Sequence, residues 1–279
     1  MISILFGLFS ALCYGTSDFL GGLFSRRFGA YRVTFYAALF GFPILLVAAA
    51  IIPQTGLTGS EWIICFLAGV TGSIGLLSLY LAMAIGKLSI AAPLSALIAA
   101  LLPVTAGLIT DGFPGPVVMA GFVLALVAVW LITRSSSGEE SDRFTLKDLR
   151  LPLIAGIGFG IYLILIHQAS QHAVIWPMVG SRSAAILVLF IIAAFNRQLS
   201  LSQSFPWHLV LLSSVLDVGG NALYILAGQY GRMDVAAVLS SLFPGVTAIL
   251  AWLILHEKIN RSQAMGILAA LGAIVLITI

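Results

Sequence analysis

The sequence predicts an all-α membrane protein, with ten transmembrane helices in two inverted five-helix repeats around a central cavity. Three observations lead to this fold class: the composition, the number of apolar segments, and a motif that recurs along the chain. Of the 279 residues, 61% are hydrophobic and only 8% are charged, and the mean hydropathy is +1.13. Soluble domains carry about a quarter charged residues. We therefore expect a lipid bilayer around the chain, and we do not take its basic pI as a sign of nucleic-acid binding.

Ten apolar segments are each close to the roughly 20 residues that a helix needs to cross a bilayer. The predicted spans are 2–24, 32–52, 61–84, 88–110, 116–133, 151–170, 175–195, 207–229, 234–255 and 262–279. The only long polar stretch, residues 134–150, lies almost at the midpoint. We predict a first five-helix repeat at 1–133, a charged linker at 134–150 and a second five-helix repeat at 151–279.

The same motif occurs once in each half of the chain. Gly86–Leu97 reads GKLSIAAPLSAL, and 145 residues later Gly231–Leu242 reads GRMDVAAVLSSL. The register then continues without a gap to the end of each half. An odd number of predicted spans separates the copies, so the two halves face opposite ways across the membrane. Inverted repeats of this kind are typical of secondary transporters.

Basic residues predict how the chain is oriented in the membrane. The loops after spans 1, 3, 5, 7 and 9 hold 11 of the 13 Lys and Arg residues, which leaves Arg182 and Arg232 on the other side. Loops rich in Lys and Arg face the cytoplasm. We expect a multi-pass protein of the plasma (bacterial inner) membrane, with a cytoplasmic linker and both termini outside.

Only two acidic residues, Asp18 and Asp217, lie within the predicted spans. A charged side chain at the centre of a span costs about 2.5–3.5 kcal/mol on insertion scales, so such residues point to function. Asn221 and Tyr224 follow Asp217 at spacings that place all three on one helix face. That face offers a carboxylate, an amide and a phenol to a polar solute; the alternative is that Asp217 only hydrogen-bonds a neighbouring helix.

Asp18 has two open interpretations. Tyr14 lies four residues earlier on the same face, and Arg26 and Arg27 follow about two turns later. Asp18 either forms an ion pair with one of these arginines at the membrane surface or lies at the mouth of the cavity. If it faces the interior of the bundle, it is a candidate proton carrier.

The repeated motif also carries prolines inside spans 4 and 9. Pro93 and Pro103 lie in span 4, and Pro244 lies in span 9. An internal proline frees a backbone carbonyl, which lipid tolerates only where it faces protein or a water-filled cavity. Interrupted helices at corresponding positions indicate a binding site near the membrane midplane. A kink that serves only packing is the alternative.

The sequence lacks the motifs that mark several classes of enzyme and ATP-binding protein. There is no GxxxxGKS phosphate-binding loop, no HExxH and no cysteine cluster, and we interpret Cys13 and Cys65 as packing residues. We therefore expect no cofactor, no metal site and no enzymatic activity, and we do not expect ATP bound to this chain to drive transport.

The second half resembles a known family most strongly at residues 235–277, with its His256-Glu257-Lys258 turn and the following Gln263-x-x-Gly266. The chain is similar to EamA-type transporters of the drug/metabolite transporter superfamily, although the first half reads Asp111-Gly112-Phe113-Pro114 where the acidic turn is expected. The resemblance implies a ten-span bundle with a cavity formed by spans 1, 3, 4, 6, 8 and 9. It also implies secondary transport of small metabolites, commonly export of amino acids. In those spans we predict these substrate-binding residues: Tyr14, Asp18, Tyr80, Ser95, Tyr162, Asp217, Asn221, Tyr224 and Ser240.

The leading hypothesis is a secondary transporter, an exporter, of a small polar or amphipathic metabolite such as an amino acid, working by alternating access. The alternatives are proton-coupled efflux of lipophilic cations or drugs, and a membrane scaffold that transports nothing. The expected partners are the metabolite and the lipid bilayer, with a proton or a second substrate molecule as the coupling species and no nucleic acid. The sequence leaves the choice between monomer and homodimer open.

Overall fold

The computed structural model describes residues 1–84, 88–133, 149–199, 205–255 and 261–278, so most of the predicted linker lies outside the described residues. The described residues form helices and turns and contain no strand. The helices are α1 (Ile2–Phe28), α2 (Ala30–Ile51), α3 (Gly59–Ala84), α4 (Leu88–Thr110), α5 (Pro116–Thr133), α6 (Arg150–Ala169), α7 (Ile175–Phe195), α8 (Trp207–Gln229), α9 (Met233–Ser240), α10 (Phe243–Leu255) and α11 (Arg261–Thr278).

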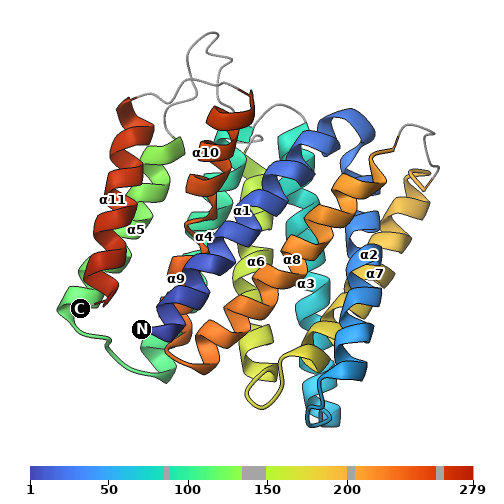
Figure 1. Ribbon diagram of the computed structural model, residues 1–279, viewed down its shortest axis with the longest axis horizontal. Helices are drawn as coiled ribbons and strands as arrows, with labels where there is room; N and C mark the ends of the chain where they lie inside the picture. Colours follow the sequence, from blue (N-terminus) through green and yellow to red (C-terminus); the bar gives the residue numbers. More distant parts are fainter. Residues whose placement is uncertain (85–87, 134–148, 200–204, 256–260, 279) are drawn as a thin grey trace.

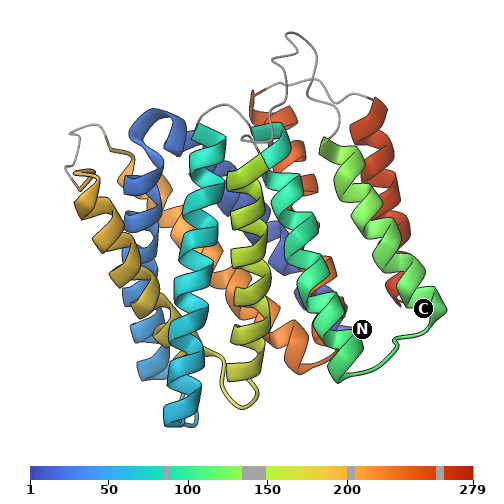
Figure 2. The same cartoon turned by 180° about the vertical axis from the view of Figure 1, so that it is seen from behind.

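The helices run between two edges of the molecule (Figures 1 and 2). The terminal edge holds the beginning of α1 and the end of α11, and the linker edge holds the end of α5 and the beginning of α6. As a result, α1 runs from the terminal edge to the linker edge, whereas α6 runs the opposite way.

The helices have the length and composition of membrane spans. Among the described residues, seven segments are long and apolar enough to cross a bilayer, with α9 and α10 counted together as Met233–Ile254. Three shorter apolar helices accompany them, at Leu94–Thr110, Pro116–Leu131 and Ala264–Ile277. The predicted all-helical membrane fold is confirmed, while the ten crossings and the inverted repeat remain predictions.

The packing of the helices relates the two halves to each other. The most extensive contacts join α3 to α6, α1 to α8, α5 to α11 and α4 to α6, and α1 also packs on both α9 and α10. In the predicted repeat, α1 corresponds to α6, α3 to α8, α4 to α9 and α10 together, and α5 to α11. Exchanging each helix for its counterpart turns the α3–α6 pair into α8–α1. The same exchange turns α4–α6 into α9 and α10 on α1, and it leaves α5 on α11.

Glycines allow the central helices to approach closely. A Cβ on Gly69 of α3 would lie 2.0 Å from the carbonyl oxygen of Ser181 in α7. A Cβ on Gly158 of α6 would lie 2.6 Å from the carbonyl oxygen of Thr71 in α3. Close packing through small residues is a main source of helix association in lipid, where apolar surface gains little by leaving the solvent. These contacts pack α3 closely against both α6 and α7.

The proline-containing spans differ in structure. Predicted span 9 is two helices, α9 and α10, which meet at Ser241 and Leu242 just before Pro244. Predicted span 4 is a single helix, α4, which continues through Pro103. The expected interruption at corresponding positions is therefore found in the second half only.

Polar contacts around the turn before α9 bridge two turns at the terminal edge. The Arg232 guanidinium donates to the backbone oxygens of Asp111 and Gly112, at 3.1 and 2.7 Å, in the turn after α4. Arg232 also forms an ion pair of 2.7 Å with Asp234, whose side chain is fully buried. This single arginine ties the α8–α9 turn to the α4–α5 turn.

Candidate functional site

A cavity lies at the centre of the bundle and is bordered by residues of α1, α2, α3, α4, α6, α7, α8, α9 and α10, with Ser241 from the turn between the last two. The space open to the centres of water-sized molecules is about 120 Å³. A single buried water needs only about 10–15 Å³, so the cavity holds several waters or a small solute. Polar side chains in its wall are Tyr14, Asp18, Ser73, Tyr162, Ser181, Arg182, Asp217, Asn221, Ser240 and Ser241. The rest of the wall is mostly apolar, as in most ligand sites.

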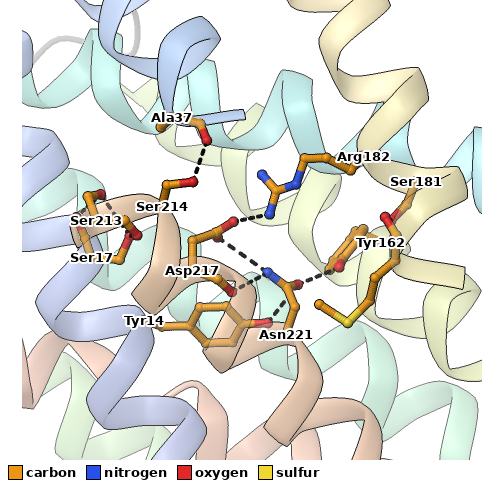
Figure 3. Close-up of polar contacts among 11 residues, drawn as sticks. Tyr14, Ser17, Ala37, Tyr162, Ser181, Arg182, Ser213, Ser214, Asp217 and Asn221 are labelled. Carbon is orange, nitrogen blue, oxygen red and sulfur yellow. Dashed lines mark hydrogen bonds and ion pairs between the residues drawn. The ribbon is translucent and has the colours of Figure 1, made fainter. Parts of the chain in front are cut away.

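An ion pair between Arg182 of α7 and Asp217 of α8 lies in the cavity wall (Figure 3). The side chains are only 11% and 21% exposed. From the sequence we expected Arg182 on the side opposite the linker, together with Arg232, and this was wrong, because Arg182 lies within α7. Arg182 lies seven residues after the first residue of α7, inside the apolar run, which is the signal that could have identified it. Both side chains line the cavity, so the pair presents its two opposite charges to the cavity together.

Asn221, one turn after Asp217, joins three helices through its side-chain amide (Figure 3). Its nitrogen donates to the Asp217 backbone oxygen at 2.7 Å and to the Asp217 carboxylate at 3.3 Å. Its oxygen accepts from the hydroxyl of Tyr14 in α1, at 2.9 Å, and from the hydroxyl of Tyr162 in α6. The amide thus has both hydrogens and its oxygen engaged, and it fixes the orientation of the Asp217 carboxylate.

Asp18 faces the interior of the bundle. Asp18 is 8% exposed and lines the cavity. Within the described residues its carboxyl makes no ion pair. Of the two arginines considered from the sequence, Arg26 donates to the Met83 backbone oxygen and Arg27 lies over the ring of Phe28. The structure therefore favours the cavity position for Asp18 over the surface ion pair.

Six of the predicted substrate-binding residues line the cavity: Tyr14, Asp18, Tyr162, Asp217, Asn221 and Ser240. The other three predicted residues are buried behind it. The Tyr224 hydroxyl donates to the Leu163 backbone oxygen at 3.0 Å, and the Ser95 hydroxyl donates to Ala92 of its own helix at 2.9 Å. Tyr80 is 1% exposed and packs against Gly21 of α1. Substrate binding by any of the nine residues remains a prediction.

The described residues contain no group of three or more His, Cys, Asp or Glu side chains that could hold a metal ion. The polar residues of the cavity are tyrosines, serines, one amide, two carboxyls and one guanidinium. This set suits recognition of a solute by charge and hydrogen bonding.

Comparison with known proteins identifies the family. The model of the EamA-like transporter family matches residues 1–134 and 149–279, which is nearly the whole chain. The chain belongs to the EamA-like transporter family. The resemblance noted in the sequence is thus confirmed, and membership points to a multi-pass membrane transporter of small molecules rather than to an enzyme.

A solved structure has the same fold as this EamA-like protein. A crystal structure, described only as that of a protein, aligns over 99% of this chain and 96% of its own, with a TM-score of 0.74 and 15% sequence identity. At that identity the likeness concerns the fold alone. Among curated proteins, none matches the chain significantly.

Proposed function

We propose that this EamA-like protein is a secondary transporter that exports a small polar or amphipathic metabolite, such as an amino acid, by alternating access. The observation that carries the proposal is the central cavity with the Arg182–Asp217 ion pair in its wall. An amino acid has one carboxylate and one ammonium group. Arg182 matches the carboxylate, the acidic side chains match the ammonium, and the apolar wall accommodates the side chain.

The architecture in this proposal is ten spans in two inverted five-helix repeats, divided at the linker. The two segments that match the family model, the opposite directions of α1 and α6, and the exchange of helix pairs between halves all support it. Alternating access in inverted repeats is largely a rocking of one half against the other around a fixed site. The Arg232 contacts at the terminal edge would break when that edge opens.

Orientation follows from the basic residues. With Arg182 buried in α7, Arg232 is the one basic residue left to the terminal edge, against eleven assigned by sequence to the linker edge. The positive-inside rule then places the linker in the cytoplasm and both termini outside, in the plasma membrane. Because Arg182 lies inside the bundle, the excess of basic residues at the linker edge is larger.

The test is a solute screen on the purified full chain in lipid nanodiscs, read as thermal unfolding, followed by flux of the best solute in proteoliposomes. The probes are the twenty common amino acids. A solute at a hundred times its Kd stabilises a protein by about 2.7 kcal/mol, so a binder raises Tm measurably. We expect at least one amino acid to stabilise the chain and to cross the membrane.

Two variants sharpen the screen. Asp217→Asn is expected to remove the stabilisation by that solute. Asp111→Asn is the matched control. Asp111 is exposed and does not line the cavity, and among the described residues its side chain accepts a hydrogen bond from Thr110 alone. If no amino acid shifts Tm or crosses the membrane, or if Asp217→Asn transports as well as the native chain, the proposal is wrong. A shift with any solute also argues against a scaffold without a binding cavity.

A second candidate function is proton-coupled efflux of lipophilic cations. It is favoured by Asp18, a buried cavity carboxyl that makes no ion pair among the described residues. This function requires that binding of a cation such as tetraphenylphosphonium releases protons from the purified protein, and that Asp18→Asn abolishes the release. Binding without proton release in the native chain would exclude it.

A further inference from the structure

The helices pack into two groups, and each group mixes the two halves of the sequence. In the first group, the α6 bundle, α3 and α4 both pack extensively on α6, and α3 also packs on α7. In the second group, the α1 bundle, α1 packs on α8, α9 and α10, and α2 packs on α8. Helices α1 and α8 lie on the near face in Figure 1, and α3 and α6 lie on the near face in Figure 2. With α2 as the counterpart of α7, the predicted repeat turns one bundle into the other.

The two bundles are joined unequally along their boundary. Across it, α2 packs extensively on α7, whereas the contacts of α8 with α6 and with α7 are slight. At the terminal end of the α2–α7 contact, the Gln54 side-chain oxygen accepts from the backbone N–H groups of Val174 and Ile175 at 3.0 and 2.8 Å. At the linker end, the Tyr36 hydroxyl donates to the backbone oxygen of Leu199 at 3.1 Å. The α2–α7 contact is therefore bonded at both ends.

The candidate binding residues face each other across the same boundary. Arg182 lies on α7 in the α6 bundle, and its partner Asp217 lies on α8 in the α1 bundle. The hydrogen bond from Tyr162 of α6 to Asn221 of α8 also joins the two bundles (Figure 3). A solute held by the Arg182–Asp217 pair would thus contact both bundles at once.

Between the cavity and the terminal edge, three side chains after Asn221 donate from the α1 bundle to backbone oxygens of the α6 bundle. The Tyr224 hydroxyl donates to Leu163 at 3.0 Å. The Gln229 side chain donates to Ser170. The Arg232 contacts with the α4–α5 turn continue the series. We call Tyr224, Gln229 and Arg232 the three terminal donors, and together they bridge the boundary where α6 and α8 have little other contact.

Most of these bonds are of a kind that water can replace. The acceptor Ser170 follows the last residue of α6, and the acceptors Asp111 and Gly112 follow the last residue of α4. Carbonyls at helix ends have no intrahelical partner, so water satisfies them when a side-chain donor leaves. Within the α1 bundle the situation differs, because the hydroxyl oxygens of Ser17 and Ser213 lie 3.0 Å apart and both residues are buried. The boundary is therefore where the fold opens with the least loss of bonding.

From this packing we propose that alternating access moves the α1 bundle against the α6 bundle about the α2–α7 contact, and that the three terminal donors are the gate that separates when the terminal edge opens. The two sequence halves do not move as units, because each is divided between the bundles. The inference rests on the proposed function, and it adds which bodies move and which contacts open.

The first cross-link joins the two sequence halves within one bundle. Ser17→Cys and Ser213→Cys are combined in a chain whose native cysteines are replaced by alanine, and the pair is oxidised to a disulfide. The close approach of the two hydroxyl oxygens suits this bond. Flux of the amino acid that gives the largest shift in the screen is measured in proteoliposomes. We expect the disulfide to change flux less than about twofold, because α1 and α8 move together.

The second cross-link stays within one sequence half but joins the two bundles. Ser170→Cys and Gln229→Cys, in the same background, are linked by a short bis-methanethiosulfonate. We expect flux to fall at least about tenfold and to return when dithiothreitol cleaves the link, because the gate is held together. Each single-cysteine variant treated with the same reagent is the control and should keep its flux. Mass spectrometry measures the extent of both cross-links.

A measurement of distance tests the gate without any solute. Spin labels at Asp111 and Tyr230, both exposed, report across the boundary, whereas labels at Asp111 and His172 report within the α6 bundle. In nanodiscs we expect Gln229→Ala to increase a longer-distance population for the first pair and to leave the second pair unchanged. Gln171→Ala is the matched control, because that glutamine donates to a backbone oxygen of its own helix at 2.8 Å.

The contrary results are distinct. If the Ser17–Ser213 disulfide stops flux and the Ser170–Gln229 link does not, the sequence halves move as units and the inference is wrong. If the first label pair shows the same distances in Gln229→Ala as in the native chain, the terminal donors are not a gate. If no amino acid binds the native chain, the proposed function fails, and the spin labels still test the motion of the bundles.

Discussion

Arg182 and Asp217 bring two opposite charges into a cavity with a mainly apolar wall, and the two charges neutralise each other. Removing one member of a buried pair leaves an uncompensated charge, which costs about 3–5 kcal/mol, whereas replacing both by neutral groups costs far less. The pair is therefore a structural element as well as a candidate for recognition, and the two roles can be separated.

At this residue scale, we predict that Arg182→Gln lowers the free energy of unfolding by about 3–5 kcal/mol, and that adding Asp217→Asn to it recovers at least half of the loss. The measurement is thermal or denaturant unfolding of the purified chain in detergent. The double variant should still bind no amino acid. If the two losses simply add, the side chains do not compensate each other and the pair is not formed.

The sequence predicted the acidic member of this pair but not the basic one. Asp217 is recognisable because a carboxyl within an apolar run is unusual, and the same argument applies to Arg182 at its position inside α7. That the two meet could not be predicted, because their contact depends on how α7 and α8 cross. Tyr224 shows the same limit: it follows Asn221 by three residues, and that rotation is enough to turn its hydroxyl toward Leu163.

At the scale of helices, the apolar runs predicted where helices lie, and the glycines decide how closely they pack. Gly69 of α3 contacts the α7 backbone, whereas Gly219 of α8 has open space, with only the Cys13 sulfur 3.8 Å from where its Cβ would be. Sequence alone cannot distinguish these two glycines, because both lie in apolar helices with small neighbours.

We predict that Gly69→Ala destabilises the protein by about 1–3 kcal/mol, because backbone must move to admit the methyl group. Gly219→Ala, the matched control, is expected to be neutral or to stabilise by up to about 1 kcal/mol, since alanine is the better helix former. Both variants are compared by Tm and by yield from the membrane. Equal stability of the two would mean that α3 and α7 are not packed through Gly69.

Pro244 has a different effect at the same scale, since it divides one predicted span into α9 and α10. We predict that Pro244→Ala changes Tm only slightly, because Pro244 is the second residue of α10 and proline is tolerated in the first turn of a helix. Solute binding is expected to weaken in the same variant, because a helix continued through residue 244 would move Ser240, Ser241 and Phe243 in the cavity wall. Pro103→Ala in α4 is the control: it is expected to leave binding nearly unchanged, because α4 is already continuous. A Pro244→Ala protein that binds as tightly as the native chain would show that the break has no role in recognition.

At the scale of the whole molecule, the orientation proposed from charge can be tested directly. The α2–α3 turn lies at the terminal edge, where Thr55 is exposed, and Ser137 belongs to the predicted linker. In a background where Cys13 and Cys65 are replaced by alanine, single cysteines are introduced at either position. Cys65 is fully buried, so Cys65→Ala could affect folding. The Tm of this variant is therefore measured first.

We expect a membrane-impermeant maleimide added to intact cells to label Thr55→Cys and not Ser137→Cys, and to label both once the membrane is opened. The reason is the excess of Lys and Arg at the linker edge, which favours retention of that edge in the cytoplasm during insertion. Labelling of Ser137→Cys alone in intact cells would reverse the orientation. Export would then have to begin from the terminal edge, and the Arg232 contacts to the α4–α5 turn would close the cytoplasmic side instead of the outer one.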